Sequence, residues 1–203
     1  MNIDIQTNIL DKLMQSVGNT QMTRIEYKFI SDLVQTIPNC NFLVFGTGRD
    51  SDLWLESNKT GKTVFLEPDK HWIDIAKEKN QTIDIRHVEY KTHPSQALQM
   101  FFEFKKTGQM PNIPPLPEDI INTEWDVIFI DSPVGGVNGR MSSIFISDVL
   151  SKYTKKDTHI FLHDCERDIE MLYGHLFLYP GCKVVEEYNW ESNQFTKLNY
   201  YVK

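Results

Sequence analysis

A glycine-containing turn and a carboxylate stand at the ends of two consecutive strand-like runs. The apolar run NFLVF is followed by Gly46-Thr47-Gly48, and the run KTVFLE ends in Glu67. Glycine lets the backbone approach a ligand closely because it has no Cβ. A carboxylate about 20 residues after such a turn accepts hydrogen bonds from a ribose diol in nucleotide-binding folds. We therefore predict that Gly46, Thr47, Gly48 and Glu67 bind the nucleoside part of a cofactor.

The sequence after the turn indicates which cofactor fits. The third glycine of the G-x-G-x-x-G pattern is missing, because position 51 is Ser51. A pyrophosphate therefore has a poorer cradle than in a dinucleotide enzyme, and S-adenosylmethionine, which carries no phosphate, fits better. Asp50 and Ser51 are predicted to belong to the same cofactor-binding loop. A dinucleotide dehydrogenase is the weaker alternative, and a tight strand-to-helix turn without any ligand is another.

Two later strand-like runs end in groups that can move protons. WDVIFID ends in Asp131, and THIFLHD ends in His163 and Asp164. Methyl transfer to a hydroxyl needs near-attack geometry and removal of the hydroxyl proton, so each of the three is a candidate general base. Asp131 is also expected close to the cofactor. Asp164 has a structural alternative as the N-cap of the next helix.

A divalent cation is a second possibility at the same strand ends. Asp131 and Asp164 are candidate metal ligands, because carboxylates at such positions suit Mg²⁺ or Mn²⁺. Base catalysis without a metal is favoured, since the sequence contains no tight ligand motif.

Two arginines are candidate catalytic-site residues if the acceptor carries a carboxylate, because guanidinium binds carboxylate through two parallel hydrogen bonds. Arg140 follows Gly139 at a predicted helix start, where a cation opposes the helix dipole unless an anion lies nearby. Arg167 has the alternative of pairing with Asp168 or Glu170 on a solvated face.

The order of predicted elements positions these groups along one sheet edge. Strands separated by helices predict a parallel sheet with helices on both faces. A hairpin at the C-terminal end, with Glu191-Ser192-Asn193 at its turn, adds antiparallel strands. The other predicted strands are 41–46, 62–67, 83–90, 125–131 and 158–164, and the predicted helices are 3–17, 23–36, 68–79, one from Pro94 with Leu98 and Phe102 among its apolar positions, 140–153 and one ending near Tyr179.

The resulting prediction is an α/β fold, namely a Rossmann-like class I methyltransferase fold. It has a mostly parallel seven-stranded sheet, a C-terminal antiparallel hairpin and N-terminal helices. We predict a single domain over residues 1–203, divided into an N-terminal helical cap over 1–37 and a core over 38–203. The length suits one domain with a sizeable core.

Charge and composition indicate which kinds of partner and which cellular setting to expect for this chain. The formal net charge is −7, so nonspecific attraction to nucleic acid is not expected. No run approaches 18 apolar residues and no signal peptide is evident, which predicts no membrane span. The three cysteines form no C-x-x-C pair, so we expect a reduced, cytoplasmic setting.

Four motifs in order resemble the glucuronoxylan 4-O-methyltransferase family of polysaccharide-biosynthesis proteins. They read PNCNFLVFGTGRDSDLW, TVFLEPDKHW, WDVIFIDSPVGG and THIFLHDCERDIE. The resemblance implies a Rossmann-like domain that binds S-adenosylmethionine and methylates a sugar hydroxyl, which in plant members is O4 of glucuronic acid on xylan. The chain departs from those members after Asp131, where Ser-Pro-Val-Gly-Gly replaces the usual Ala-Pro and Gly-Tyr. The region between residues 91 and 118 is also short.

These features together predict an S-adenosylmethionine-dependent O-methyltransferase. The acceptor is predicted to be the O4 hydroxyl of glucuronic acid or of a related saccharide. One alternative is an O-methyltransferase for a small molecule that is not a sugar. Another is a non-catalytic binding protein that keeps the cofactor fold.

Overall fold

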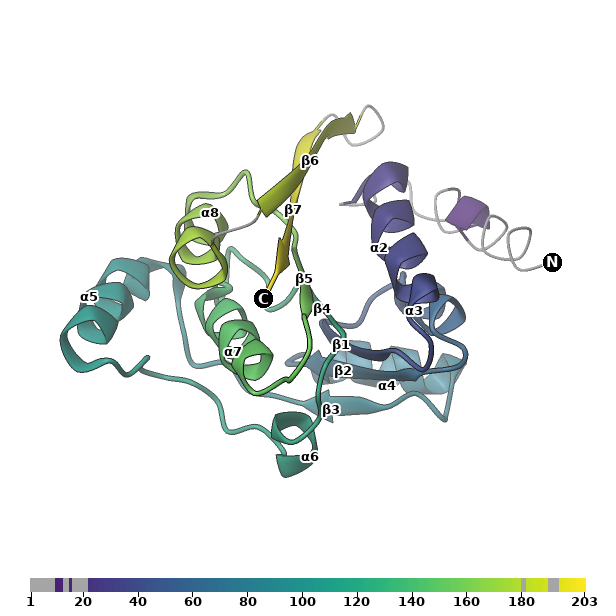
Figure 1. The fold of residues 1–203 in the computed structure, drawn as a ribbon, viewed down its shortest axis with the longest axis horizontal. Coiled ribbons are helices and arrows are strands. Elements are labelled where there is room, and N and C mark those ends of the chain that lie inside the picture. Colours follow the sequence, from purple (N-terminus) through teal and green to yellow (C-terminus); the bar gives the residue numbers. More distant parts are fainter. Residues whose placement is uncertain (1–9, 13–14, 16–21, 180–181, 190–193) are drawn as a thin grey trace.

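The computed structural model describes residues 10–12, 15, 22–179, 182–189 and 194–203 (Figure 1). Most of the helix predicted over 3–17 and the turn predicted at 191–193 lie outside these residues. The described helices are α2 (Arg24–Thr36), α3 (Ser51–Ser57), α4 (Lys70–Lys79), the 3₁₀ turn η1 (Pro94–Gln96), α5 (Ala97–Thr107), α6 (Glu118–Ile121), α7 (Met141–Lys152), α8 (Asp168–Tyr173) and the π-helical turn η2 (Gly174–Leu178). The strands are β1 (Asn41–Phe45), β2 (Lys62–Glu67), β3 (Ile85–His87), β4 (Val127–Ile130), β5 (His159–Leu162), β6 (Cys182–Asn189) and β7 (Gln194–Val202).

The described strands form one seven-stranded sheet in the order β3-β2-β1-β4-β5-β7-β6. Strands β1 to β5 pair in parallel, whereas β7 runs antiparallel to both β5 and β6. The predicted fold class is therefore confirmed. The chain order reverses between β1 and its neighbour β4, and ligands of open parallel sheets bind beyond the carboxyl ends of the strands at such a reversal.

Both faces of the sheet are covered by helices, as the alternation of strand with helix predicted. In β1, Phe42 and Val44 join the core beneath α2, α3 and α4, while Leu43 and Phe45 join the core beneath α5, α7 and α8 (Figure 1). Successive side chains of a strand point to opposite faces, so a strand that is apolar throughout needs a cover on each side.

Helix α2 is anchored at its start by a capping box. The backbone N–H of Thr23 donates to Glu26 Oε2 at 2.7 Å, and the backbone N–H of Glu26 donates to Thr23 Oγ1 at 3.4 Å. Thr23 and Glu26 thus satisfy each other's backbone N–H groups. The same Glu26 oxygen also accepts a hydrogen bond from Thr196 Oγ1 of β7 at 3.1 Å. The residue that caps α2 therefore also connects this helix to strand β7.

Three elements differ from the sequence-based expectation. Strand β3 is shorter than the predicted run 83–90, because only Ile85, Arg86 and His87 pair with β2. The helix after η1 buries Ala97, an expected apolar position, but it exposes Leu98 and Phe102 and buries Met100 in their place. The last helix changes from α8 to a π-helical turn before Tyr179.

Within the part of the chain that the structure describes, no helix is both long and apolar enough to cross a bilayer.

Gly61 is required where the turn after α3 packs against the start of β1. A Cβ at this position would lie 2.2 Å from the carbonyl oxygen of Cys40 and 2.7 Å from its nitrogen. Those atoms belong to a buried backbone that pairs with Lys62, whose N–H donates to the same carbonyl at 2.9 Å.

We expect Gly61→Ala to lower the free energy of unfolding by about 1–3 kcal/mol, because an added methyl group overpacks a fixed backbone. Denaturant unfolding measures the loss. Gly136→Ala is the matched control, since no atom lies within 4 Å of the Cβ that it adds. Equal stabilities of the two variants would contradict the assigned packing.

Candidate active site

A cavity of about 680 Å³ opens at the carboxyl ends of the central strands. This volume lies within the range typical of small-molecule sites. Six of the residues predicted to bind a cofactor line it: Gly46, Thr47, Gly48, Asp50, Glu67 and Asp131. The seventh, Ser51, is buried behind the turn, where its Oγ accepts a hydrogen bond from the N–H of Gly48 at 3.0 Å.

Gly46 allows the ends of β1 and β4 to lie close together. Its φ of +110° is one that side chains rarely adopt, and a Cβ there would lie 3.0 Å from Cβ of Ser132. Its N–H donates to the carbonyl of Leu66 at 2.9 Å, which continues the parallel pairing with β2. The glycine therefore keeps the floor of the cavity open at the strand ends.

Glu67 fixes the shape of the turn from the neighbouring strand. Its Oε2 accepts hydrogen bonds from the N–H of Thr47 at 2.6 Å and from Thr47 Oγ1 at 3.0 Å, and its Oε1 accepts one from the N–H of Asp69 at 2.8 Å. Burial raises the pKa of this carboxyl. A carboxylate has about four acceptor positions, so Glu67 keeps capacity for a ligand.

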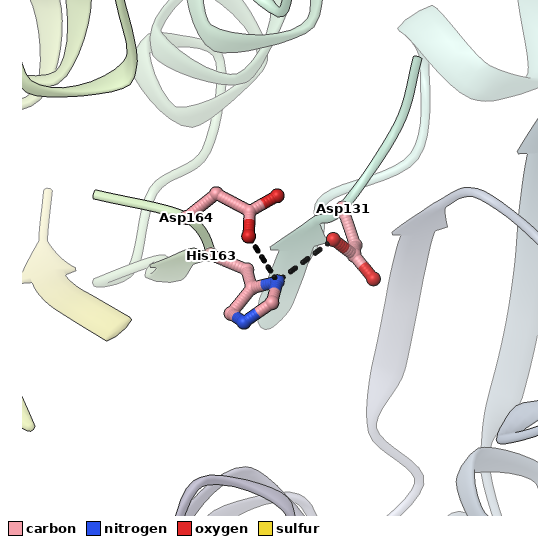
Figure 2. Close-up of side chains that lie close together, drawn as sticks. All are labelled: Asp131, His163 and Asp164. Carbon is pink, nitrogen blue, oxygen red and sulfur yellow. Dashed lines mark hydrogen bonds and ion pairs between the residues drawn. The ribbon is translucent and has the colours of Figure 1, made fainter. Parts of the chain in front are cut away.

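Asp131, His163 and Asp164 come together just beyond the ends of β4 and β5, as Figure 2 shows. The Nδ1 atom of His163 lies 3.0 Å from Asp131 Oδ1 and 3.4 Å from Asp164 Oδ1. The side chain of His163 is fully buried and that of Asp164 is 6% exposed, whereas that of Asp131 is 25% exposed. Asp131 is therefore the one of these three that faces the cavity.

The charges of this cluster determine its protonation. Burial lowers the pKa of His163, but Asp131 and Asp164 outweigh it and raise the pKa to about 9. Burial raises the pKa of Asp131, but His163 and Arg140 outweigh it, so this pKa lies below its ordinary value. At neutral pH the pair is an imidazolium and a carboxylate, and the group able to accept a proton is Asp131.

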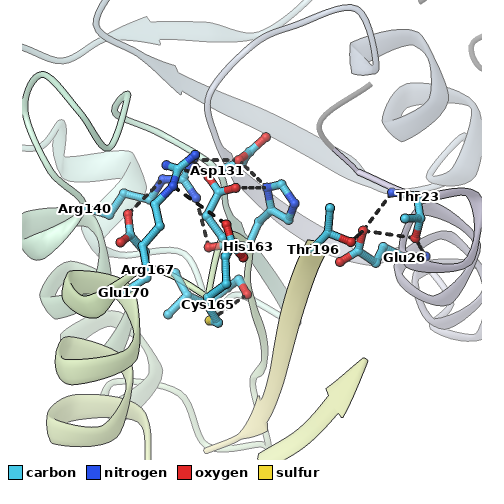
Figure 3. Close-up of polar contacts among 12 residues, drawn as sticks. Thr23, Glu26, Asp131, Arg140, His163, Cys165, Arg167, Glu170 and Thr196 are labelled. Carbon is cyan, nitrogen blue, oxygen red and sulfur yellow. Dashed lines mark hydrogen bonds and ion pairs between the residues drawn. The ribbon is translucent and has the colours of Figure 1, made fainter. Parts of the chain in front are cut away.

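Arg140 is buried with the same cluster and completes it (Figure 3). Its Nη2 lies 2.9 Å from Asp131 Oδ1 and 2.5 Å from Asp164 Oδ2, and its Nη1 donates to the carbonyl of His163 at 3.0 Å. The negative charge expected near this helix start is thus that of Asp131 and Asp164. The side chain is 3% exposed, which leaves the guanidinium facing its own carboxylates rather than solvent.

Arg167 lies at the outside of the cluster. Its Nη1 is 2.9 Å from Asp164 Oδ2, and its side chain is 41% exposed. It pairs with Asp164 and Glu166 rather than with the expected Asp168 or Glu170. It is the N-cap of α8, so Asp164 is not the cap of that helix. Asp164 instead has a φ of +60°, a left-handed conformation that Asp tolerates.

Sequence reasoning missed several residues of the cavity wall. His87 ends β3 and Glu89 follows it, and Val134 and Val137 follow β4. Their positions after strand ends were a usable signal. Trp72 of α4 also lines the cavity. Glu26 and Tyr27 do not line the cavity, but the charge of His163 acts on Glu26, and the charges of Asp50 and Asp131 act on Tyr27, across long sequence separations.

Comparisons with known proteins give a consistent result. The IRX15/IRX15L/GXM family model matches residues 25–192. The chain is 37% identical over 165 residues to arabinogalactan O-methyltransferase 2 of Arabidopsis thaliana, covering 71% of this chain and 57% of that protein. It is 31% identical over 197 residues to glucuronoxylan 4-O-methyltransferase 2 of the same plant, covering 87% and 68%. The chain spans 57–63% of the first three relatives' lengths.

Solved structures share the fold at low sequence identity. The N-methyltransferase NodS from Bradyrhizobium japonicum superposes with a TM-score of 0.56 at 10% identity, covering 89% of this chain and 95% of that one. Human methyltransferase-like protein 13 in complex with SAH gives a TM-score of 0.50 at 12% identity, covering 87% and 77%. These similarities support the methyltransferase fold and no more than the fold.

We expect the ring of His163 to titrate near pH 9, above the ordinary histidine value near 6.5. A raised folded-state pKa contributes stability that is complete below about pH 6.5 and is lost as pH rises through about 9. NMR titration of the ring carbons measures the midpoint, and Asp131→Asn should move it down because one counter-charge is removed.

His159 is the internal control for this titration, because burial lowers its pKa. A His163 midpoint at or below that of His159 would show that the carboxylate pairing is wrong.

Proposed function

Because the chain belongs to the IRX15/IRX15L/GXM family, we propose that it is an S-adenosylmethionine-dependent O-methyltransferase whose acceptor is a saccharide hydroxyl. One observation carries the proposal: the glycine turn, Glu67 and Asp131 line a single cavity at the strand-order reversal. The names of the relatives refer to arabinogalactan and glucuronoxylan, which are polysaccharides. They support a saccharide, with O4 of a glucuronic acid as the specific candidate.

The chemistry of the cavity suits a cationic nucleoside cofactor. The wall carries the carboxyls of Asp50, Glu67, Asp69, Glu89 and Asp131, against the basic side chains of Lys70 and His87. An acidic wall repels the pyrophosphate of a dinucleotide and attracts a sulfonium and an ammonium group. Glu67 would hold the ribose diol, the glycine turn would lie under the amino-acid part, and Asp69 and Trp72 would border the base.

Asp131 is our candidate for the group that orients the acceptor and takes its proton. S-adenosylmethionine, when bound, supplies a methyl group on a sulfonium centre. The acceptor oxygen becomes strongly acidic as it gains a bond to carbon, so a carboxylate with a low pKa suffices as the proton acceptor. His163 is an unsuitable base at neutral pH, since its pKa of about 9 keeps it protonated.

Arg140 and Arg167 have separate roles in this proposal. Arg140 is a positioning residue, because its buried guanidinium holds Asp131 Oδ1 and Asp164 Oδ2. Arg167 is the more exposed cation of the two and lies against Gly135, in the loop that follows β4. A carboxylate on the acceptor would pair with Arg167.

A divalent cation is left out of the proposed mechanism. Asp131, His163 and Asp164 each offer a ligand atom, and these atoms lie within 4.8 Å of one another. However, the Nδ1 of His163 bonds to Asp131, and two guanidinium groups already neutralise Asp164. A cation there would have to displace a proton and lie beside two positive charges.

We expect Glu67→Gln to weaken S-adenosylmethionine binding by about tenfold or more, because an amide cannot accept a hydrogen bond on its nitrogen and the turn loses a charged acceptor. Calorimetric titration measures the affinity. Glu78→Gln, on the exposed side of α4, is the matched control and should bind normally. Unchanged affinity in Glu67→Gln would remove this carboxylate from the cofactor site.

The function itself is tested by an acceptor screen with isotope-labelled S-adenosylmethionine. Glucuronate-bearing oligosaccharides should accept label, while phenols and neutral sugars should accept little. We expect Asp131→Asn to lower kcat by about 100-fold or more, with a much smaller change in cofactor affinity. EDTA should leave the rate unchanged. Preferred labelling of phenols would favour the small-molecule alternative, and no labelling of any acceptor would favour a non-catalytic protein.

A further inference from the structure

Asp50 is a second carboxylate on the cavity wall, beside Asp131. It precedes α3, and its Oδ2 accepts a hydrogen bond from the indole Nε1 of Trp54 at 3.0 Å. Trp54 is 1% exposed and packs against Tyr27 and Phe129, with ring centroids 5.8 and 5.3 Å apart. A buried indole thus fixes one oxygen of Asp50, while the residue lines the space that the proposed cofactor would occupy.

The charged and titratable groups around Asp50 come from several other segments of the chain. Burial and the charge of Asp131 raise the pKa of Asp50 to about 7, while the positive charge of His163 acts in the opposite direction. Tyr27, on α2, has a raised pKa. Burial is the largest cause, and the negative charges of Asp50 and Asp131 add to it. Glu67 and Asp69 add negative charge to the same cavity. Like charges this close are costly unless a cation or a proton neutralises one of them.

We propose that Asp50 matches its charge to that of the cofactor: it is ionised opposite a sulfonium cation and protonated once that positive charge is gone. The inference rests on the proposed function and adds a second group that handles the proton in the same reaction. It separates the carboxylate that meets the acceptor, Asp131, from the carboxylate that finally keeps the proton, Asp50.

The balance of the transfer requires an acceptor for one proton, and Asp50 can be that acceptor. The carbon–sulfur bond breaks with its electron pair left on sulfur, a carbon–oxygen bond forms, and the acceptor hydroxyl releases one proton. The cavity thereby loses one positive charge and gains one proton. If Asp131 takes that proton and passes it to Asp50, the net charge inside the cavity is the same before and after transfer. Asp131 returns to the ionised form that His163 and Arg140 stabilise.

Proton linkage on binding tests the inference without turnover. Isothermal titration calorimetry at pH 7, in two buffers of different ionisation enthalpy, counts the protons released when a ligand binds. A group with a pKa of about 7 is about half protonated there, so S-adenosylmethionine should release about half a proton more from wild type than from Asp50→Asn. S-adenosylhomocysteine, which has no sulfonium, should show no such difference. The amino group of each ligand contributes equally in both proteins and cancels.

Affinity against pH gives the second measurement. Wild-type affinity for S-adenosylmethionine should rise about tenfold between pH 6 and pH 8, relative to Asp50→Asn, because Asp50 becomes ionised over that range. Asp50→Glu keeps a carboxylate and should restore the rise. Asp52→Asn, on the exposed side of α3, is the matched control and should behave as wild type.

The outcomes separate this inference from the proposed function. Binding of S-adenosylmethionine with equal proton release in wild type and Asp50→Asn would overturn the role of Asp50 and leave the methyltransferase proposal standing. Absence of binding to folded wild type would overturn the methyltransferase proposal.

If Asp50→Asn does not fold, carboxyl-carbon NMR of wild type decides: the Asp50 signal should titrate near pH 7 with S-adenosylhomocysteine and well below it with S-adenosylmethionine. Identical titrations would overturn the inference.

Discussion

Asp131 Oδ1 is the atom on which the arrangement of the site depends. It accepts hydrogen bonds from His163 Nδ1 at 3.0 Å and from Arg140 Nη2 at 2.9 Å. Those partners follow β5 and precede α7, so a single oxygen joins three segments of the chain. Buried charges are tolerated only when they are paired and hydrogen-bonded, and the loss of one member leaves the others unpaired. The cluster therefore fixes the carboxylate that faces the cavity.

The N-terminal helix completes this arrangement from the opposite side. Glu26 caps α2 and accepts a hydrogen bond from Thr196 of β7 (Figure 3). The positive charge of His163 acts to lower the pKa of Glu26, against the larger effect of burial. Tyr27, on the same helix, lies within the field of Asp50 and Asp131. Helix α2 therefore does more than cover the sheet, since it closes the polar region behind the cavity. A change in its packing would alter the charges that the cofactor and the acceptor meet.

The loop after Asp131 is where we expect this chain to depart from the pattern of plant family members. It contributes Ser132, Val134 and Val137 to the cavity wall, and the two valines are 67% and 60% exposed. Exposed apolar side chains at a cavity mouth are suited to contact a ligand. In the proposed function the glycine turn and Glu67 form the cofactor side of the cavity, and this loop forms part of the acceptor side. We therefore expect acceptor choice to be the property in which this chain differs most from its relatives.

The sequence by itself determined the fold class, the order of the strands along the chain and the glycine turn with Glu67, because these follow from local periodicity and from a fixed spacing along one chain segment. It also identified Asp131, His163 and Asp164 as polar groups at one sheet edge. Only the tertiary structure decided which of them faces the cavity, that Arg140 is buried against carboxylates and Arg167 is not, and that Asp50 shares a wall with Asp131. Protonation depends on burial and on charges brought together from distant segments, and neither is encoded in spacing along the chain.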